Sequence, residues 1–294
     1  MCIYEGSCKS ELKDLRKEFI RDLIRSFSRN NVNANLELAR EIVGERIEGL
    51  LRMGFNVFIV DAVLEVPGVF GCSHGVLRNV FEVGLFWDHI VDLPFIPGSS
   101  FKGGVRGSLE ALLIGKGKSG WEDDVKILFG EGGDRGWAGS LLFLDAYPVG
   151  LSEGTKYLLE PDILTPHYQK DTETIGFEYE VEPVPISHIS IAPGTIFRFV
   201  VAYSLNDDLE EALVNIGSYI ELGNRVAHSI VMLSILRNAF ENYGLGARTS
   251  RGYGRFSIQR LSVEMGGRRF NTPVEIRSKN ARRSRGLRKT KKGV

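Results

Sequence analysis

The chain has 294 residues, of which 43% are hydrophobic and 25% are charged, a composition typical of a globular protein with a sizeable core. This composition argues against a disordered chain. No apolar stretch approaches the roughly 18 residues that a membrane-spanning helix needs. The net charge of zero is unevenly spread, because residues 268–294 hold eleven Lys or Arg and one acid, a balance of +10, which leaves −10 on residues 1–267. A basic tail on an acidic body indicates an arm for nucleic acid or for an acidic partner; a solvated end kept for solubility is the alternative.

The cysteines and the N-terminus point to the cytoplasm. Cys2, Cys8 and Cys72 form no CxxC pair and are odd in number, which favours a reducing compartment. The N-terminus lacks the apolar core of a signal peptide. We therefore expect a cytoplasmic protein without a membrane segment, and we expect no metal and no cofactor.

The first two stretches of the chain have helical periodicity. Apolar residues recur every three or four positions over residues 10–29 and again over 35–53. Residues 1–53 are therefore predicted to form an N-terminal helical extension. Gly54 ends this pattern, and residues 55–66, dense in β-formers, are predicted to be the first strand.

Further strands are expected over residues 77–87 and 91–96, and they lead to a loop that opens a helix ending near Ile114. Ser99 or Ser100 can cap this helix, and its two cations lie one turn apart on one face. Such a helix start is a candidate phosphate site, although a surface pair of cations is the alternative. Three glycines weaken the helix unless something must approach it closely, which favours the site. The candidate residues are Gly98, Ser99, Ser100, Lys102 and Arg106.

The remaining elements complete the expected fold. A helix is predicted over residues 121–129 and a strand over 139–147, followed by a long irregular connection over 148–191. A strand over 195–203, a helix over 207–243 that is interrupted near Gly217 to Gly223, and a last strand over 255–263 follow. This order predicts an α+β, ferredoxin-like (RRM-like) domain with a mostly antiparallel sheet and both main helices on one face. We place this domain at residues 54–262, with an insertion at about 148–193 and a basic tail at 263–294.

A glycine-rich loop lies between the long helix and the last strand. Two Gly-apolar-Gly triplets, 244–246 and 252–254, flank a polar spacer. Glycine allows positive φ and close approach to a ligand, and the arginines and hydroxyls between the glycines suit phosphate oxygens. The alternative is a helix C-cap followed by a tight turn. The candidate residues of this loop are Gly246, Arg248, Thr249, Ser250, Arg251 and Arg255.

Known catalytic motifs do not fit the sequence. Gly117-Lys118-Ser119 is not a P-loop, because the first glycine would fall at Leu112 inside a helix. His74 and His167 are candidate general bases, and each is more typical of a hydrogen-bonding or stacking residue. Asp145 and Asp162 alone do not define a metal site.

Four stretches resemble a known family. Phe95 to Arg106 is similar to the segment that opens the first helix of the repeat-associated mysterious proteins (RAMPs) of CRISPR systems, and Gly244 to Phe256 is similar to their C-terminal glycine-rich loop. Leu144 to Pro148 and Asp162 to Lys170 resemble the sixth-subunit family of the type III-B Cmr effector complex. The resemblance covers residues 54–262, with departures after Lys170, so the central hairpin differs from the family pattern.

The resemblance implies a function as well as a RAMP core with an inserted β-hairpin, or thumb. It implies a non-catalytic subunit that binds the guide RNA and caps the backbone of the complex towards the 3′ end of the guide. The implied partners are guide RNA, with target RNA as a further candidate, and other Cmr subunits: the backbone RAMP subunit, the small helical subunit and the terminal RAMP subunit. Residues 67–75, which correspond to the cutting loop of the backbone subunit, contain no Asp or Glu.

Two points stay open at this level. His167 and Tyr168 in the central hairpin are candidates for RNA contact, and Tyr168, Ile163 or Leu164 are candidates to wedge against bases. The rival interpretation is a metal-independent endoribonuclease that processes guide RNA with a histidine base, because some RAMPs do so.

Overall fold

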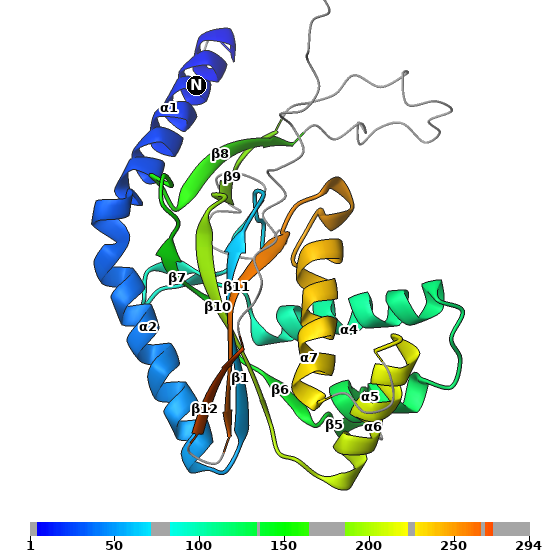
Figure 1. Ribbon diagram of the computed structural model, residues 1–294. Coiled ribbons are helices and arrows are strands. Elements are labelled where there is room, and N and C mark those ends of the chain that lie inside the picture. Colours follow the sequence, from blue (N-terminus) through cyan, green and yellow to red (C-terminus); the bar gives the residue numbers. More distant parts are fainter. Residues whose placement is uncertain are drawn as a thin grey trace, which may run out of the picture.

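An antiparallel sheet lies at the centre of the protein (Figure 1). The computed structural model describes residues 5–71, 83–133, 136–164, 186–222, 227–265 and 268–272. The strand order is β12–β11–β1–β10–β6, with β7 also paired to β10, and every pairing in it is antiparallel, as predicted. Its strands are β1 (Asn56–Leu64), β6 (Leu141–Phe143), β7 (Tyr147–Leu151), β10 (Thr195–Tyr203), β11 (Phe256–Met265) and β12 (Arg268–Thr272).

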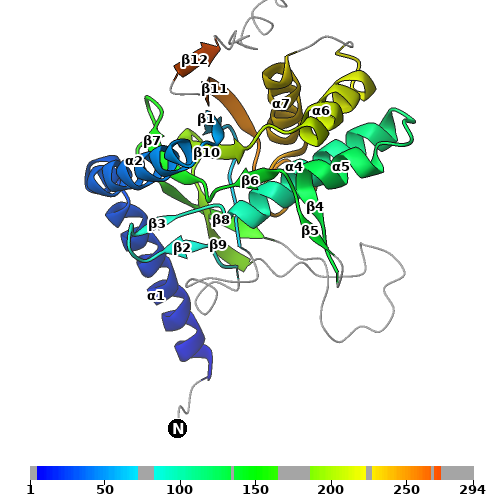
Figure 2. The same cartoon turned by 90° about the horizontal axis from the view of Figure 1, so that it is seen from below.

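Helices cover both faces of this sheet (Figures 1 and 2). The helices that follow β1 and β10 lie on one side, as the sequence predicts. On the other side lies α2 (Arg29–Arg52), with α1 (Glu5–Ser26) extending from it. Among the described residues, no helix combines the length and the apolar character needed to cross a membrane. The helices of the first side are α4 (Gly98–Gly115), α5 (Glu122–Phe129), α6 (Asp207–Tyr219), α7 (His228–Arg237) and the π-helix η2 (Asn238–Tyr243).

An aromatic cluster joins the sheet to the helices. Phe199 of β10 lies with its ring centroid 4.9 Å from that of Phe101 in α4, 4.6 Å from Phe240 in η2 and 5.2 Å from Phe256 in β11. All four rings are fully buried. Large aromatic rings dominate the free energy gained from burial, so this cluster fixes α4 and η2 on the sheet.

The central strand β1 is covered on both sides. Val57 and Val60, which point to opposite faces, are both buried. Asp61 differs from these apolar residues because it carries a charge. Its carboxylate accepts two hydrogen bonds, of 2.7 and 2.9 Å, from Arg198 directly opposite on β10. The hydrogen bond to Asp61 raises the pKa of Arg198, although burial opposes this effect. Arg198 is therefore held in a charged contact within the sheet and is not available as a free cation.

The connection over residues 148–191 differs from the irregular segment that was expected. It contains β7 and a hairpin of β8 (Leu159–Leu164) and β9 (Ile186–Ile191), while residues 165–185 lie outside the described part of the chain. Sequence periodicity missed the hairpin because each strand is only six residues long and β8 contains Pro161. The inserted hairpin implied by the family resemblance thus has a strand-paired base.

Other boundaries also shifted. The predicted strand over residues 139–147 divides into β6 and β7, and between them Asp145 and Ala146 contact the segment at the start of α4, through Gly98 and Ile96 respectively. Of the predicted strand over 77–87, the described part contains only β2 (Trp87–Asp88), which pairs with β3 (Leu93–Pro94), and residues 72–82 lie outside it. The remaining short elements are β4 (Gly130–Glu131), β5 (Trp137–Ala138) and the 3-10 helix η3 (Thr249–Arg251).

Candidate nucleic-acid interface

A groove of about 570 Å³ lies between α4 and the glycine-rich loop. Ser100, Gly103 and Gly107 line it from α4, and Gly246 and Thr249 line it from the loop. The two glycine-rich stretches singled out in the sequence therefore face each other across this groove. Among the described residues, Phe70, Phe86 and Tyr243 also line the groove and are its aromatic members.

The glycines of α4 have two separate functions in this groove. A Cβ atom at Gly104 would lie 2.6 Å from Cδ2 of Leu245, so a larger residue there would displace the Leu245 side chain where helix and loop pack. At Gly103 and Gly107 a Cβ atom would meet nothing within 4 Å. Because neither packing nor backbone φ requires glycine at these two positions, they keep the groove wide.

The glycine-rich loop is fixed by its own backbone. Leu245 donates its N–H to the carbonyl of Gly254 at 2.8 Å, and Ala247 donates to Val69 at 2.9 Å. A Cβ atom at Gly254 would lie 1.8 Å from the Leu245 carbonyl oxygen, and one at Gly246 would lie 2.5 Å from the Phe70 ring. Much of the glycine content of the loop is thus required by its packing, with φ values of +67° and +88° at these two positions.

The start of α4 is capped by a different residue from those predicted. The helix begins at Gly98, with Pro97 at the N-cap position and no side-chain cap from a serine of the first turn. The Gly98 N–H donates instead to Oδ1 of Asp145 at 2.7 Å. The expectation that Ser99 or Ser100 caps the helix is therefore wrong. A phosphate at the Gly98 N–H would also face a carboxylate, which disfavours the predicted contact of this residue with RNA.

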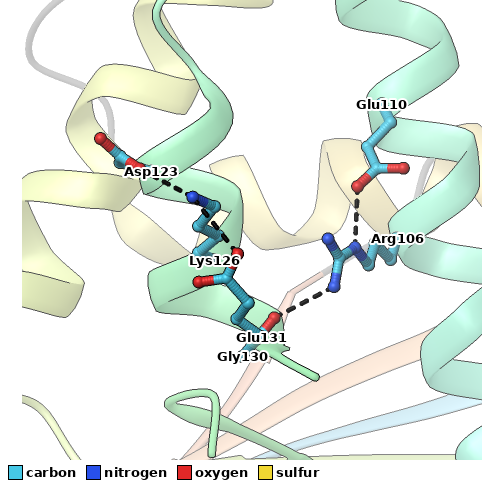
Figure 3. Close-up of polar contacts among 6 residues, drawn as sticks. All are labelled: Arg106, Glu110, Asp123, Lys126, Gly130 and Glu131. Atoms are coloured by element: carbon cyan, nitrogen blue, oxygen red, sulfur yellow. Dashed lines mark hydrogen bonds and ion pairs between the residues drawn. The ribbon is translucent and has the colours of Figure 1, made fainter. Parts of the chain in front are cut away.

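Arg106 is already engaged within the protein. Figure 3 shows its guanidinium between Glu110, which accepts from Nε at 2.7 Å, and the carbonyl of Gly130, which accepts from Nη1 at 3.0 Å. Lys126 on α5 is held in the same way by Asp123 and Glu131, at 3.3 and 3.5 Å. These contacts weaken the case for Arg106 as a phosphate ligand. Lys102 forms no ion pair with any residue of the described chain.

The cations of the glycine-rich loop are of two kinds. Arg248, in the left-handed backbone region at φ +62°, lies with its guanidinium 4.7 Å from the ring centroid of Tyr253. The hydroxyl of Tyr253 donates to Asp162 on β8 at 2.6 Å, so this ring ties the loop to the inserted hairpin. Burial raises the pKa of Tyr253, and the hydrogen bond to Asp162 raises it further. Arg251 and Arg255 are exposed and form no ion pair with a described residue.

The described lining of this groove contains none of the remaining candidate residues. His167, Tyr168 and His74 lie outside the described residues, and the described chain contains no group of three His, Cys, Asp or Glu that could hold a metal. Asp145 and Asp162 serve α4 and Tyr253 respectively and do not form a pair. Sequence reasoning missed Tyr243 and Phe86, because an aromatic residue at a loop boundary carries no signal of the groove that it lines. It also missed Tyr253, whose contact with Asp162 joins residues far apart in the chain.

Fold and site together define an α+β protein whose glycine-rich loop, before the last core strand, packs against the first core helix. The RAMP superfamily model matches residues 51–257, and the chain belongs to this superfamily.

Individual relatives are more specific than the superfamily. The chain is similar to the CRISPR system CMR subunit Cmr6 of Saccharolobus solfataricus, with 28% identity over 87% of the chain and 77% of that protein. It is 30% identical to Cmr6 of Pyrococcus furiosus over 40% of the chain and 30% of that protein. Among solved structures, a chain of the cryo-EM structure of the type III-B Cmr-beta complex bound to cognate target RNA has a TM-score of 0.63 and 28% identity, over 90% of this chain and 80% of the other.

Proposed function

We propose that this chain is a non-catalytic, guide-RNA-binding subunit that caps the backbone of a type III-B Cmr effector complex, towards the 3′ end of the guide. The observation that carries the proposal is the similarity to Cmr6, and to a chain of an RNA-bound Cmr complex, over nearly the whole length. The groove and two exposed arginines of its glycine-rich loop, which form no ion pair with a described residue, give this function a physical basis.

The fold supports the assignment. The order β11–β1–β10–β6, antiparallel throughout, is the one produced by a split βαβ repeat, so we infer a ferredoxin-like core. The division into residues 1–53, 54–262 and 263–294, with an insertion at about 148–193, belongs to the same proposal. The inferred partners are guide RNA, its target RNA and the other Cmr subunits, in the cytoplasm.

Recognition must be independent of base sequence, because a guide carries arbitrary sequences. RNA of any sequence presents the same phosphates, and the proposal assigns their contact to Arg251 and Arg255. The hydroxyls of Ser99, Ser100, Thr249 and Ser250 supply neutral donors at the same edge. His167 and Tyr168 remain predicted contacts of the hairpin.

We expect the double variant Arg251→Gln/Arg255→Gln to bind single-stranded RNA more weakly on every sequence alike. The slope of log K against log salt concentration should become shallower by roughly 1.4, because two phosphate contacts are lost from a single strand. Binding of mixed-sequence RNA at several salt concentrations measures this slope.

The matched control is Arg25→Gln/Arg52→Gln, which removes the same charge from α1 and α2. These arginines already pair with Asp22 at 3.7 Å and with Glu48 at 2.9 Å in their own helices. Equal slopes for the two double variants would refute the assignment of Arg251 and Arg255. Absence of RNA binding by the unmodified chain at low salt would refute the proposed function itself.

A further inference from the structure

The groove between α4 and the glycine-rich loop differs in chemistry from its surroundings. None of its described lining residues carries a charge. Its polar side chains are the hydroxyls of Ser100, Ser108, Thr249 and Tyr243, and the Ser108 hydroxyl already donates to the Val105 carbonyl at 2.9 Å. A phosphate inside the groove would lose its hydration and meet no cation, which is costly.

Aromatic walls suit a different part of a nucleotide. Tyr243 is 41% exposed at the groove, although it is a large aromatic residue. Phe86 is held in place on the other side, because its N–H donates to the Phe70 carbonyl at 2.8 Å and its ring packs 5.9 Å from that of Phe95. Exposed aromatic rings stack on nucleobases, and they do so with little preference among the bases.

The cations lie beside the groove. Lys102 directly precedes the lining residue Gly103, and the exposed Arg251 lies two residues after the lining residue Thr249. A single strand whose phosphates lie at these cations would present a base or ribose to the uncharged interior. The volume of about 570 Å³ lies within the usual range for pockets that hold a small organic group.

We infer that this groove is a nucleobase pocket, which takes one unstacked base of the RNA while the neighbouring phosphates stay at the cationic rim. This inference rests on the proposed function and specifies which part of the RNA the site holds. Because the described lining offers hydroxyls but no amide or charged side chain to read a base edge, the pocket accepts any base, as a guide-binding subunit requires.

The test has two parts: a side chain is introduced into the groove of the protein, and the bases are removed from the RNA. Gly103→Leu places a side chain into open space within the groove, and Gly115→Leu is its matched control, because Gly115 lies on the same helix, has equally open surroundings and does not line the groove. Each full-length variant is titrated with a mixed-sequence RNA oligonucleotide and with a ribose-phosphate strand of the same length that lacks bases.

We expect Gly103→Leu to weaken RNA binding by at least about fivefold relative to Gly115→Leu, and to leave binding of the base-free strand unchanged. Tyr243→Ala should reproduce this pattern, and Tyr243→Phe, which keeps the ring, should not. Equal RNA affinities of the two glycine variants would overturn the pocket, as would an equal loss on both strands, since the groove would then hold the backbone. If the unmodified chain binds neither strand, the proposed function fails as well.

Discussion

At the scale of single residues, Asp88 supports the wall of the groove from a distance. Its Oδ1 accepts the N–H groups of Ile90 and Val91 at 2.8 and 3.2 Å, and its Oδ2 accepts the hydroxyl of Tyr147 at 2.7 Å. The ring of Tyr147 stacks on that of Phe95, at 5.6 Å between centroids, and Phe95 in turn contacts Phe86. One carboxylate thus fixes a turn and, through two rings, a side of the groove.

The protonation of this pair follows from its contacts. Burial alone would raise the pKa of Asp88, but the hydrogen bonds from Tyr147, Ile90 and Val91 outweigh it and lower that pKa. Burial, together with the bond to Asp88, raises the pKa of Tyr147 to about 12. The ionised carboxylate and the protonated phenol are therefore the stable pair at neutral pH.

We predict that Tyr147→Phe lowers the free energy of unfolding by about 1–2 kcal/mol at pH 7, because a hydrogen bond to a charged group is lost. The folded-state pKa of Asp88 lies below its unfolded value of about 3.9, so the stabilisation is present above that pH and is lost as pH falls through the folded pKa. Urea denaturation between pH 7 and pH 3 should show the difference between variant and parent shrinking.

Tyr219→Phe is the control for this prediction. Its hydroxyl donates to the carbonyl of Gly120 at 3.2 Å, and a carbonyl does not titrate in this range. The effect of Tyr219→Phe should stay constant with pH, and a constant effect of Tyr147→Phe would contradict the role given to Asp88.

At the scale of elements, the interruption between β6 and β7 positions α4. Asp145 lies in this interruption, and its carboxylate accepts the Gly98 N–H at the positive end of the helix dipole. A Cβ atom at Gly98 would lie 2.3 Å from the Phe143 carbonyl oxygen, so helix and strand are in close contact there. The Leu144 to Pro148 stretch therefore places α4, and with it one side of the groove.

Asp145→Ala should lower the free energy of unfolding by about 1 kcal/mol, since it removes the acceptor at the start of α4. Asp145→Asn keeps an acceptor without the charge, and its loss should be smaller. Denaturant unfolding measures both variants.

Arg46 also approaches Asp145, at 4.0 Å, and Arg46→Ala separates the two contributions. If Arg46→Ala costs as much as Asp145→Ala, the ion pair and not the cap accounts for the loss.

At the scale of the whole molecule, helices cover both faces of the central sheet. In RRM domains, bases stack on an open face of the sheet. Here α2 lies over that face and the α4 to α7 side lies over the other (Figures 1 and 2), which leaves the loops as the accessible part of the core. The Tyr253 to Asp162 hydrogen bond places the inserted hairpin at the same end as the glycine-rich loop. This layering supports the proposal that RNA contacts the loops.

The basic C-terminal tail sets the net charge of the whole molecule. A chain ending at Thr272 retains 28 basic and 36 acidic residues, a net charge of −8 in place of zero. We expect it to bind RNA more weakly at low salt, because a negative protein repels a polyanion, and the difference should narrow as salt rises. A full-length chain with glutamine at the nine basic positions of residues 273–294 should show the same weakening of RNA binding as the truncated chain. A loss of RNA affinity that does not change with salt concentration would contradict this electrostatic explanation.

Long periodic segments were predictable from the sequence. The strand over residues 195–203 and the pair of helices before Phe55 were predicted because one face of each repeats its apolar side chains often enough to reveal the period. The break in the helix over 207–243 was predicted from its glycines. The β8–β9 hairpin was not, since six-residue strands give too few repeats to separate them from irregular chain.

The sequence by itself determined the superfamily, the α+β class and the two glycine-rich stretches, because these depend on local patterns and on motifs in a fixed order. Only the tertiary structure decided which charges remain free. It pairs Arg106 with Glu110 and the Gly130 carbonyl, caps α4 with Asp145, and lines the groove with uncharged and aromatic groups. The physical reason is that most of these contacts join residues far apart in the chain, whose distances are set by packing on the sheet and not by sequence spacing.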